Sequence, residues 1–111
     1  MADFEETKRL TEQREAYAQS SLGFIYDNGE GVPENDAEAV RWYRLAAEQG
    51  DAIAQSNLGV MYANGRGVPE NDAEAVKGYR LAAEQGDASA QSNLRGMSAY
   101  GMVNESNRKL T

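Results

Sequence analysis

The sequence predicts an all-α solenoid, a stack of antiparallel helix hairpins that repeats every 36 residues. Residues 18–53 occur again as residues 54–89, and 28 of the 36 aligned pairs are identical, so only eight pairs differ. Within each copy, apolar residues recur at helical spacing and a glycine- and proline-containing turn separates two such segments. A fixed period of this length is typical of stacked units, because one hairpin cannot bury its apolar stripe alone.

The helix boundaries follow from capping residues, which the second copy shows best. Asp51 is the predicted N-cap of its first helix, and Gly65 ends that helix. A turn follows that includes Pro69, which has no backbone donor. Asn71 has capping-box spacing with Glu74 for the second helix, and Asp72 is an equally good cap. That helix is predicted to end at Gly86.

Two residue types inside the helices predict how the hairpins pack. Gly23 and Gly59 occupy the same register in mid-helix, where glycine costs about 1 kcal/mol relative to alanine. We expect each to mark a close helix crossing. Trp42 lies on a predicted second helix, where inter-helix packing is the first interpretation and a binding hot spot the second.

The repeat register divides the chain into four parts. Residues 3–13 match the register of a second helix, and the Gly-Val-Pro turn does not recur after Leu94, so both ends differ from the middle. The last part is either an evolved cap or the remainder of a longer array. The four parts are a worn N-terminal half repeat that forms a capping helix (1–17), a first repeat (18–53), a second repeat (54–89) and a degenerate C-terminal half repeat with a polar tail (90–111).

Composition excludes several classes of function. The net charge is −7, and residues 17–52 alone carry seven acidic and two basic side chains, which gives −5. This field repels nucleic acid and anionic membranes; it favours a basic protein partner, or serves solubility alone. The chain has neither histidine nor cysteine, and its turn carboxylates lack the spacing of a calcium loop. We therefore expect no enzyme, no catalytic residue, no metal site and no cofactor.

The first ten residues contain three acidic side chains and no apolar core, so they do not resemble a signal peptide. No segment approaches the 18 consecutive apolar residues of a membrane span. These two observations predict a cytoplasmic protein.

A candidate binding groove follows from the differences between the copies. Packing positions such as Leu22 and Leu58 are unchanged, whereas positions on the opposite side of the first helices vary, as in a recognition surface or an exposed face under relaxed drift. Tyr17 and Phe24 could instead cover residues 3–13, and Asn28 and Asn64 could simply cap helices. The predicted partner-binding residues are Tyr17, Ser20, Phe24, Asp27, Asn28, Ile53, Ser56, Val60, Ala63 and Asn64.

The repeated motif resembles the Sel-one-like repeat family, which is related to tetratricopeptide repeats. Residues 22–33 read LGFIYDNGEGVP, residues 58–68 read LGVMYANGRGV, and the resemblance covers about residues 17–94. It implies a right-handed superhelix whose first helices line a concave face, and adaptors that assemble protein complexes, many of them bacterial. Gly78 departs from the pattern where Trp42 shows the family's aromatic residue. A secreted cysteine-rich branch is linked to β-lactams, and that activity is not transferred to this cysteine-free chain.

Two functional hypotheses remain open. The first is an interaction module, an adaptor or scaffold that binds a peptide or helix of another protein in the concave groove. The alternative is a small acidic inhibitor or immunity protein that masks a basic enzyme or toxin. Weak self-association through the repeat ends is also expected, because an open solenoid end exposes apolar surface.

Overall fold

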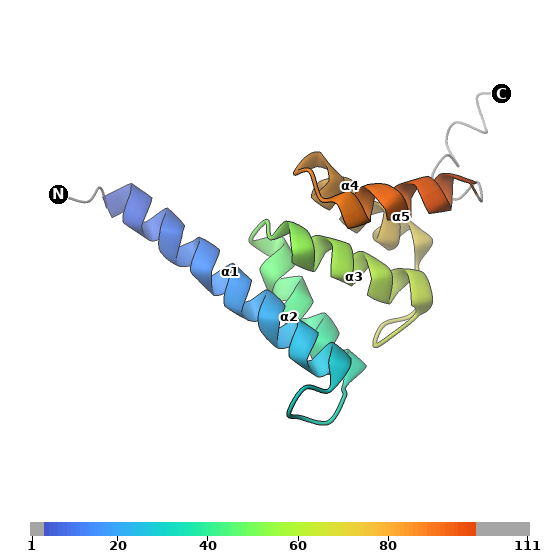
Figure 1. Ribbon diagram of the computed structural model, residues 1–111, viewed down its shortest axis with the longest axis horizontal. Helices are drawn as coiled ribbons and strands as arrows, with labels where there is room; N and C mark the ends of the chain where they lie inside the picture. The colour runs from blue at the N-terminus through green and yellow to red at the C-terminus, as the bar shows by residue number, and fades with distance from the viewer. Residues whose placement is uncertain (1–3, 100–111) are drawn as a thin grey trace.

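The computed structural model describes residues 4–99, and within that range it contains five α-helices and no strand. The molecule is elongated, with extents of 57 × 38 × 19 Å. In Figure 1, α1, α3 and α5 form the layer nearer the viewer, and α2 and α4 lie behind them. The all-α solenoid predicted from the repeat is confirmed. The helices are α1 (Phe4–Asn28), α2 (Asp36–Glu48), α3 (Ala52–Asn64), α4 (Asp72–Glu84) and α5 (Ala88–Ala99).

The predicted caps set these boundaries. The Asp51 side chain accepts a hydrogen bond from the Ala54 amide at 2.8 Å, which starts α3. Asn71 accepts one from the Glu74 amide at 3.1 Å, which starts α4. Gly65 ends α3 in the left-handed conformation with φ 63°, which only glycine adopts at low cost.

The buried core runs from each hairpin into the next. One cluster joins α2 to α3, and its largest fully buried side chains are Tyr43 and Met61. A second cluster joins α4 to α5 in the same way, around Tyr79 and Met97. Each second helix thus packs both against the first helix of its own hairpin and against the first helix of the next unit, so stacking adds apolar burial that a lone hairpin lacks.

The mid-helix glycines mark close crossings, as predicted. A Cβ atom placed on Gly23 would lie 2.5 Å from the ring of Tyr43, and one on Gly59 would lie 2.8 Å from the ring of Tyr79. Real Cβ contacts are longer, so α1 and α3 approach their partner helices only because these positions have no side chain.

The N-terminal region differs from the expectation. Residues 4–13, assigned from their register to the second helix of a worn unit, instead continue α1 without a break. Arg14 and Glu15 stand where Gly50 and Asp51 form the turn between α2 and α3, so the chain has no glycine there to leave the helix. Residues 4–15 are all exposed. The predicted polar tail lies at residues 100–111, outside the described residues.

Candidate functional site

Three large apolar side chains of the predicted groove are exposed together on α1 and α3. Tyr17 is 67% exposed, Phe24 48% and Ile53 55%. Tyr17 and Phe24 lie seven residues apart, on one side of α1, and Ile53 occupies the register of Tyr17 one repeat later. We call this surface, formed by Tyr17, Phe24 and Ile53, the first-helix face.

The alternative role of these aromatics, covering residues 3–13, does not fit the structure. The described part of that segment lies on the same straight helix as Tyr17 and Phe24, so it does not fold back over them. Leu10 is also exposed and precedes Tyr17 by seven residues. Sequence analysis missed Leu10, because its register relationship to Tyr17 holds only if α1 is continuous.

Ser20 and Ser56 belong to the predicted groove, but both are buried. They lie three residues before Gly23 and Gly59, on the side of α1 and α3 where the second helices cross. A partner could not reach them on this surface, so we leave them out of the first-helix face.

The other predicted residues on α3 are only partly available. Val60 and Ala63 are half-buried and pack against the core cluster between α4 and α5. The amide of Asn64 donates to the Val60 carbonyl at 2.9 Å, and Asn28 donates likewise to the Phe24 carbonyl at 3.0 Å. Both asparagines therefore bond to the last turn of their own helix.

Asp27, the one predicted groove residue not yet described, forms hydrogen bonds with other side chains of the protein. Its carboxylate accepts a hydrogen bond from the Tyr43 hydroxyl at 3.0 Å and one from Arg66 Nη2 at 2.5 Å. Arg66 Nη2 also lies 2.9 Å from the carboxylate of Asp36. Sequence analysis missed this network. The available signal was that positions 27/63 and 30/66 are two of the eight that differ between the copies.

Burial and charge shift the pKa of two groups in this network, Tyr43 and Arg66. The pKa of Tyr43 is raised, chiefly by burial, then by the negative charge of Asp27 and by its hydrogen bond, while Arg66 and Asn57 act in the opposite direction. The carboxylates of Asp36 and Asp27 raise the pKa of Arg66. The network therefore holds a neutral phenol and a charged guanidinium at neutral pH, which suits a structural role rather than proton transfer.

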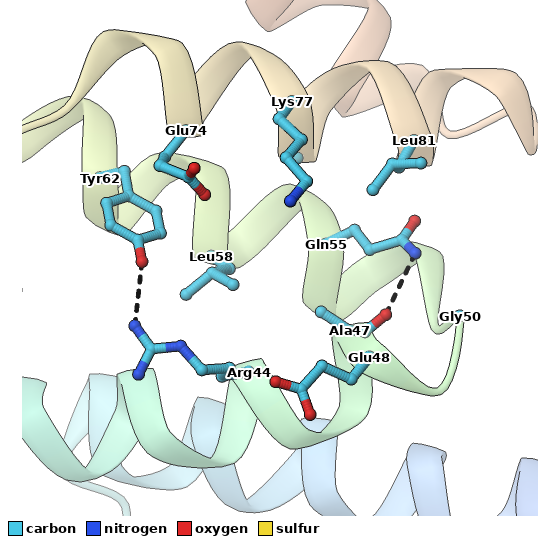
Figure 2. A pocket seen from close by; sticks show the side chains of 11 residues that line it. Arg44, Ala47, Glu48, Gly50, Gln55, Leu58, Tyr62, Glu74, Lys77 and Leu81 are labelled. Carbon is cyan, nitrogen blue, oxygen red and sulfur yellow. Dashed lines mark hydrogen bonds between the residues drawn. The ribbon is translucent and has the colours of Figure 1, made fainter.

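A pocket of about 420 Å³ opens between α2, α3 and α4, on the side of the second helices (Figure 2). Sequence analysis gave no sign of its shape. Arg44 reaches across its mouth and donates to the Tyr62 hydroxyl at 2.9 Å, and the Gln55 amide donates to the Ala47 carbonyl at 3.3 Å. Three helices and the turn before α3 supply its walls. These are Arg44, Ala47 and Glu48 of α2, Gly50 of the turn, Gln55, Leu58 and Tyr62 of α3, and Glu74, Lys77, Gly78 and Leu81 of α4.

Two further observations concern residues 4–99 alone. No helix there combines the length and the apolar character needed to cross a membrane. Nor does this part of the chain bring three or more potential metal ligands of the acidic, histidine or cysteine type together.

The sequence profile of the Sel1 repeat matches residues 16–51 and 52–87. The chain belongs to the Sel1 repeat family. The matched repeats begin two residues before those expected from the internal identity, at residues 18 and 54. Sel1 repeats form a non-catalytic family whose members generally act in protein–protein interaction. A comparison with curated proteins gave no match.

Solved structures of other Sel1 repeat proteins share the fold. A Sel1 repeat protein from Oxalobacter formigenes is 46% identical over 80% of this chain, with a TM-score of 0.76. The protein c5321, a protective antigen of uropathogenic Escherichia coli with an SLR fold, is 50% identical over 78%, also at 0.76. Helicobacter pylori cysteine rich protein B is 29% identical over 71%, at 0.66. This chain spans 37%, 18% and 59% of those chains, respectively.

Proposed function

We propose that this Sel1 repeat chain is an adaptor module that binds a helix or peptide of a partner protein across the first-helix face. The observation that carries this proposal is the joint exposure of Tyr17, Phe24 and Ile53 on one side of α1 and α3. Keeping apolar surface in water costs about 25 cal/mol per Å². Aromatic side chains in such a patch are common anchors of protein interfaces.

The spacing of the exposed side chains suits a helical partner. Leu10, Tyr17 and Phe24 follow one another at seven-residue intervals, about 10.5 Å apart along α1. A partner helix that carries apolar residues at a similar spacing could lie along this row, as in other helix-in-groove complexes. Ile53 on the adjacent α3 would contact the same partner from the side.

The acidic charge supports the second candidate, an inhibitor or immunity protein that masks a basic enzyme or toxin. Residues 17–52 carry seven acidic and two basic side chains. Arg66 of the second repeat offsets part of this charge through Asp27 and Asp36. A complex held by the remaining charge would weaken strongly as salt is added, whereas binding by the first-helix face would change little.

The test compares two exposed apolar side chains on different sides of the molecule. A partner captured from the native cell and identified by mass spectrometry would be titrated against the wild type, Phe24→Ala and the control Leu45→Ala. Leu45 is 37% exposed but lies on α2, away from the first-helix face. We expect Phe24→Ala to weaken binding about tenfold, equivalent to 1.4 kcal/mol, with little change in unfolding temperature. Equal affinities of the two variants would contradict the proposal.

A further inference from the structure

Each first helix of the stack carries an apolar edge at the same register. In α3 and α5 this edge belongs to the two core clusters and packs against the preceding second helices, α2 and α4. Because the edge recurs in α1, we expect it to suit the same kind of neighbour there. The three sets are Ala18, Leu22 and Ile25 of α1, Ala54, Leu58 and Met61 of α3, and Ala90, Leu94 and Met97 of α5.

In α1 no described helix covers this edge. Ala18 is exposed, whereas Ala54 and Ala90 are fully buried. Ile25 is half-buried, whereas Met61 is fully buried. Within residues 4–99, α1 packs chiefly against α2, and Figure 1 shows it at one end of the stack. We call this surface the α1 edge; its residues are Ala18, Leu22 and Ile25.

A hydrogen bond that accompanies the edge in α3 and α5 is also missing in α1. The side-chain amide of Gln55 in α3 donates to the Ala47 carbonyl in the last turn of α2 at 3.3 Å. Gln91 of α5 donates likewise to the Ala83 carbonyl of α4 at 3.5 Å. Gln19 occupies this register in α1, and no residue among 4–99 accepts a hydrogen bond from its Nε2 atom. A helix C-terminus would satisfy this donor, since its last carbonyls have no partner within the helix.

A tyrosine beside the edge lacks the partner of its counterpart in the same way. The Tyr62 hydroxyl of α3 accepts a hydrogen bond from Arg44 of α2 at 2.9 Å. Tyr26 stands in this register of α1, and its hydroxyl has no hydrogen-bond partner in the part of the chain that the structure describes. The apolar and the polar contacts that α2 makes with α3 are thus both available, and unused, on α1.

The missing neighbour cannot be joined to α1 as α2 is joined to α3. Gly50, with φ 93°, and the cap Asp51 form the turn between α2 and α3. Arg14 and Glu15 stand at these registers before the α1 edge, and both lie within the unbroken helix α1. A second copy of this chain does not offer a free second helix either, because its α2 and α4 already pack against α3 and α5. The neighbour therefore has to come from a different protein.

We propose that the α1 edge binds the exposed second helix at the end of another helical-repeat protein, as α3 binds α2. That helix would carry small or β-branched apolar residues at the registers of Val40 and Ala47 and an arginine at the register of Arg44. Its arginine would reach Tyr26, and its last turn would accept the hydrogen bond of Gln19. No residue of the α1 edge belongs to the first-helix face, so this proposal stands independently of the function proposed above.

The test uses a synthetic peptide of residues 35–50, which is α2 with its caps, as the probe. It is titrated into the whole chain while amide shifts are recorded by nuclear magnetic resonance. We expect saturable shifts at Ala18, Gln19 and Ile25, with a dissociation constant on the order of 1 mM, because so short a helix must be ordered on binding. Ala18→Glu should weaken binding by about fivefold or more, since it places a charge in the contact. The matched control Ala73→Glu, at an exposed alanine of α4, should stay within about twofold of the wild type.

Gln19→Glu is a second variant that tests the hydrogen bond. It keeps an oxygen that can accept from Gln49 but loses the amide donor, so binding should weaken about threefold. The proposal is overturned if the peptide at about 3 mM gives no shifts in α1, or if Ala18→Glu and Ala73→Glu bind it equally. It is also overturned if Phe24→Ala weakens binding of the peptide more than Ala18→Glu does, which would place the peptide on the first-helix face instead. Shifts at the α1 edge that depend on protein concentration alone would show that a second copy covers it, and would overturn the proposal as well.

Discussion

Arg66 of the second repeat donates a hydrogen bond to Asp27 of the first repeat, with 2.5 Å between Nη2 and Oδ1. Neither residue has a like counterpart in the other copy, because Ala63 corresponds to Asp27 and Glu30 to Arg66. The pair therefore cannot form again one repeat further along. Two of the eight differences between nearly identical repeats thus create one contact that joins them, in addition to the apolar core between α2 and α3.

We expect this contact to stabilise the stack. Asp27→Ala and Arg66→Ala should each lower the free energy of unfolding by about 1–2 kcal/mol, since charged hydrogen bonds that are partly shielded from water are lost. The double variant should lose less than the sum of the two, with a coupling energy of about 1 kcal/mol. Urea denaturation of the four proteins measures this cycle.

The control for that cycle is Arg41→Ala. Arg41 pairs with Glu38 at 3.4 Å within one helix, and its side chain is largely exposed, so the loss should be a few tenths of a kcal/mol. A coupling energy between Asp27 and Arg66 below about 0.3 kcal/mol would place their pair among ordinary surface ion pairs and refute its proposed role.

Stability should fall at alkaline pH because of two buried tyrosines. The pKa of Tyr43 is raised by burial and by Asp27, and the pKa of Tyr79 is raised by burial. In the unfolded chain a tyrosine loses its proton near pH 10, before the folded protein does. Their contribution is therefore complete below about pH 10 and is lost as pH rises above it, by up to about 1.4 kcal/mol per pH unit for each tyrosine.

The measurement is urea unfolding at several pH values from 8 to 11, for the wild type and Tyr43→Phe. Phenylalanine cannot ionise, so the variant should lose stability less steeply above pH 10, although it starts lower because Asp27 loses a donor. Other groups titrate in both proteins, and only the difference between the two curves is interpreted. Parallel curves would show that burial of Tyr43 does not disfavour its ionised form.

The helix crossings predict opposite effects for two glycine-to-alanine changes. Gly59→Ala should destabilise the protein by about 1–2 kcal/mol, because its Cβ would meet the buried Tyr79 ring at 2.8 Å and the Ala75 carbonyl at 3.1 Å. Gly96→Ala in α5 meets nothing within 4 Å, so it should stabilise by up to about 1 kcal/mol through helix propensity. Thermal unfolding of both variants checks the signs, and a shift in the same direction for both would contradict this account.

These crossings belong to the part of the fold that the sequence could predict. Because the motif occurs twice, its capping residues can be recognised in both copies, and Asp51 and Gly65 could be placed at helix ends from their chemistry alone. For the start of α4, the chemistry left Asn71 and Asp72 as candidates, and the structure shows Asn71 as the cap. The same reasoning failed at the N-terminus because it relied on shared side chains. A helix ends more readily where a residue can adopt a positive φ. Gly50 does so between α2 and α3, whereas Arg14, at the same register, remains helical.

The candidate sites were less predictable because they depend on three helices at once. Helical spacing alone placed Ser20 and Ser56 in the groove, but the crossing of the second helices covers that side of α1 and α3. The pocket at Gly78 needs walls from α2, α3 and α4, and their relative positions are set by packing between repeats. The absence of the aromatic residue was visible in the sequence, but the hollow beside it was not.

The first turns of α1 should contribute little to global stability. Residues 4–15 are all exposed, so they bury little apolar surface that would offset the entropy of ordering them. Deleting residues 1–11 should change the free energy of unfolding by less than about 0.5 kcal/mol. The amides of residues 4–12 should exchange with solvent by local fraying, far faster than those around Tyr43. Ala16 is buried, so Ala16→Glu is the matched control and should cost several kcal/mol. A deletion that costs more than 1 kcal/mol would mean that this segment is covered in solution, by the chain itself or by a second copy.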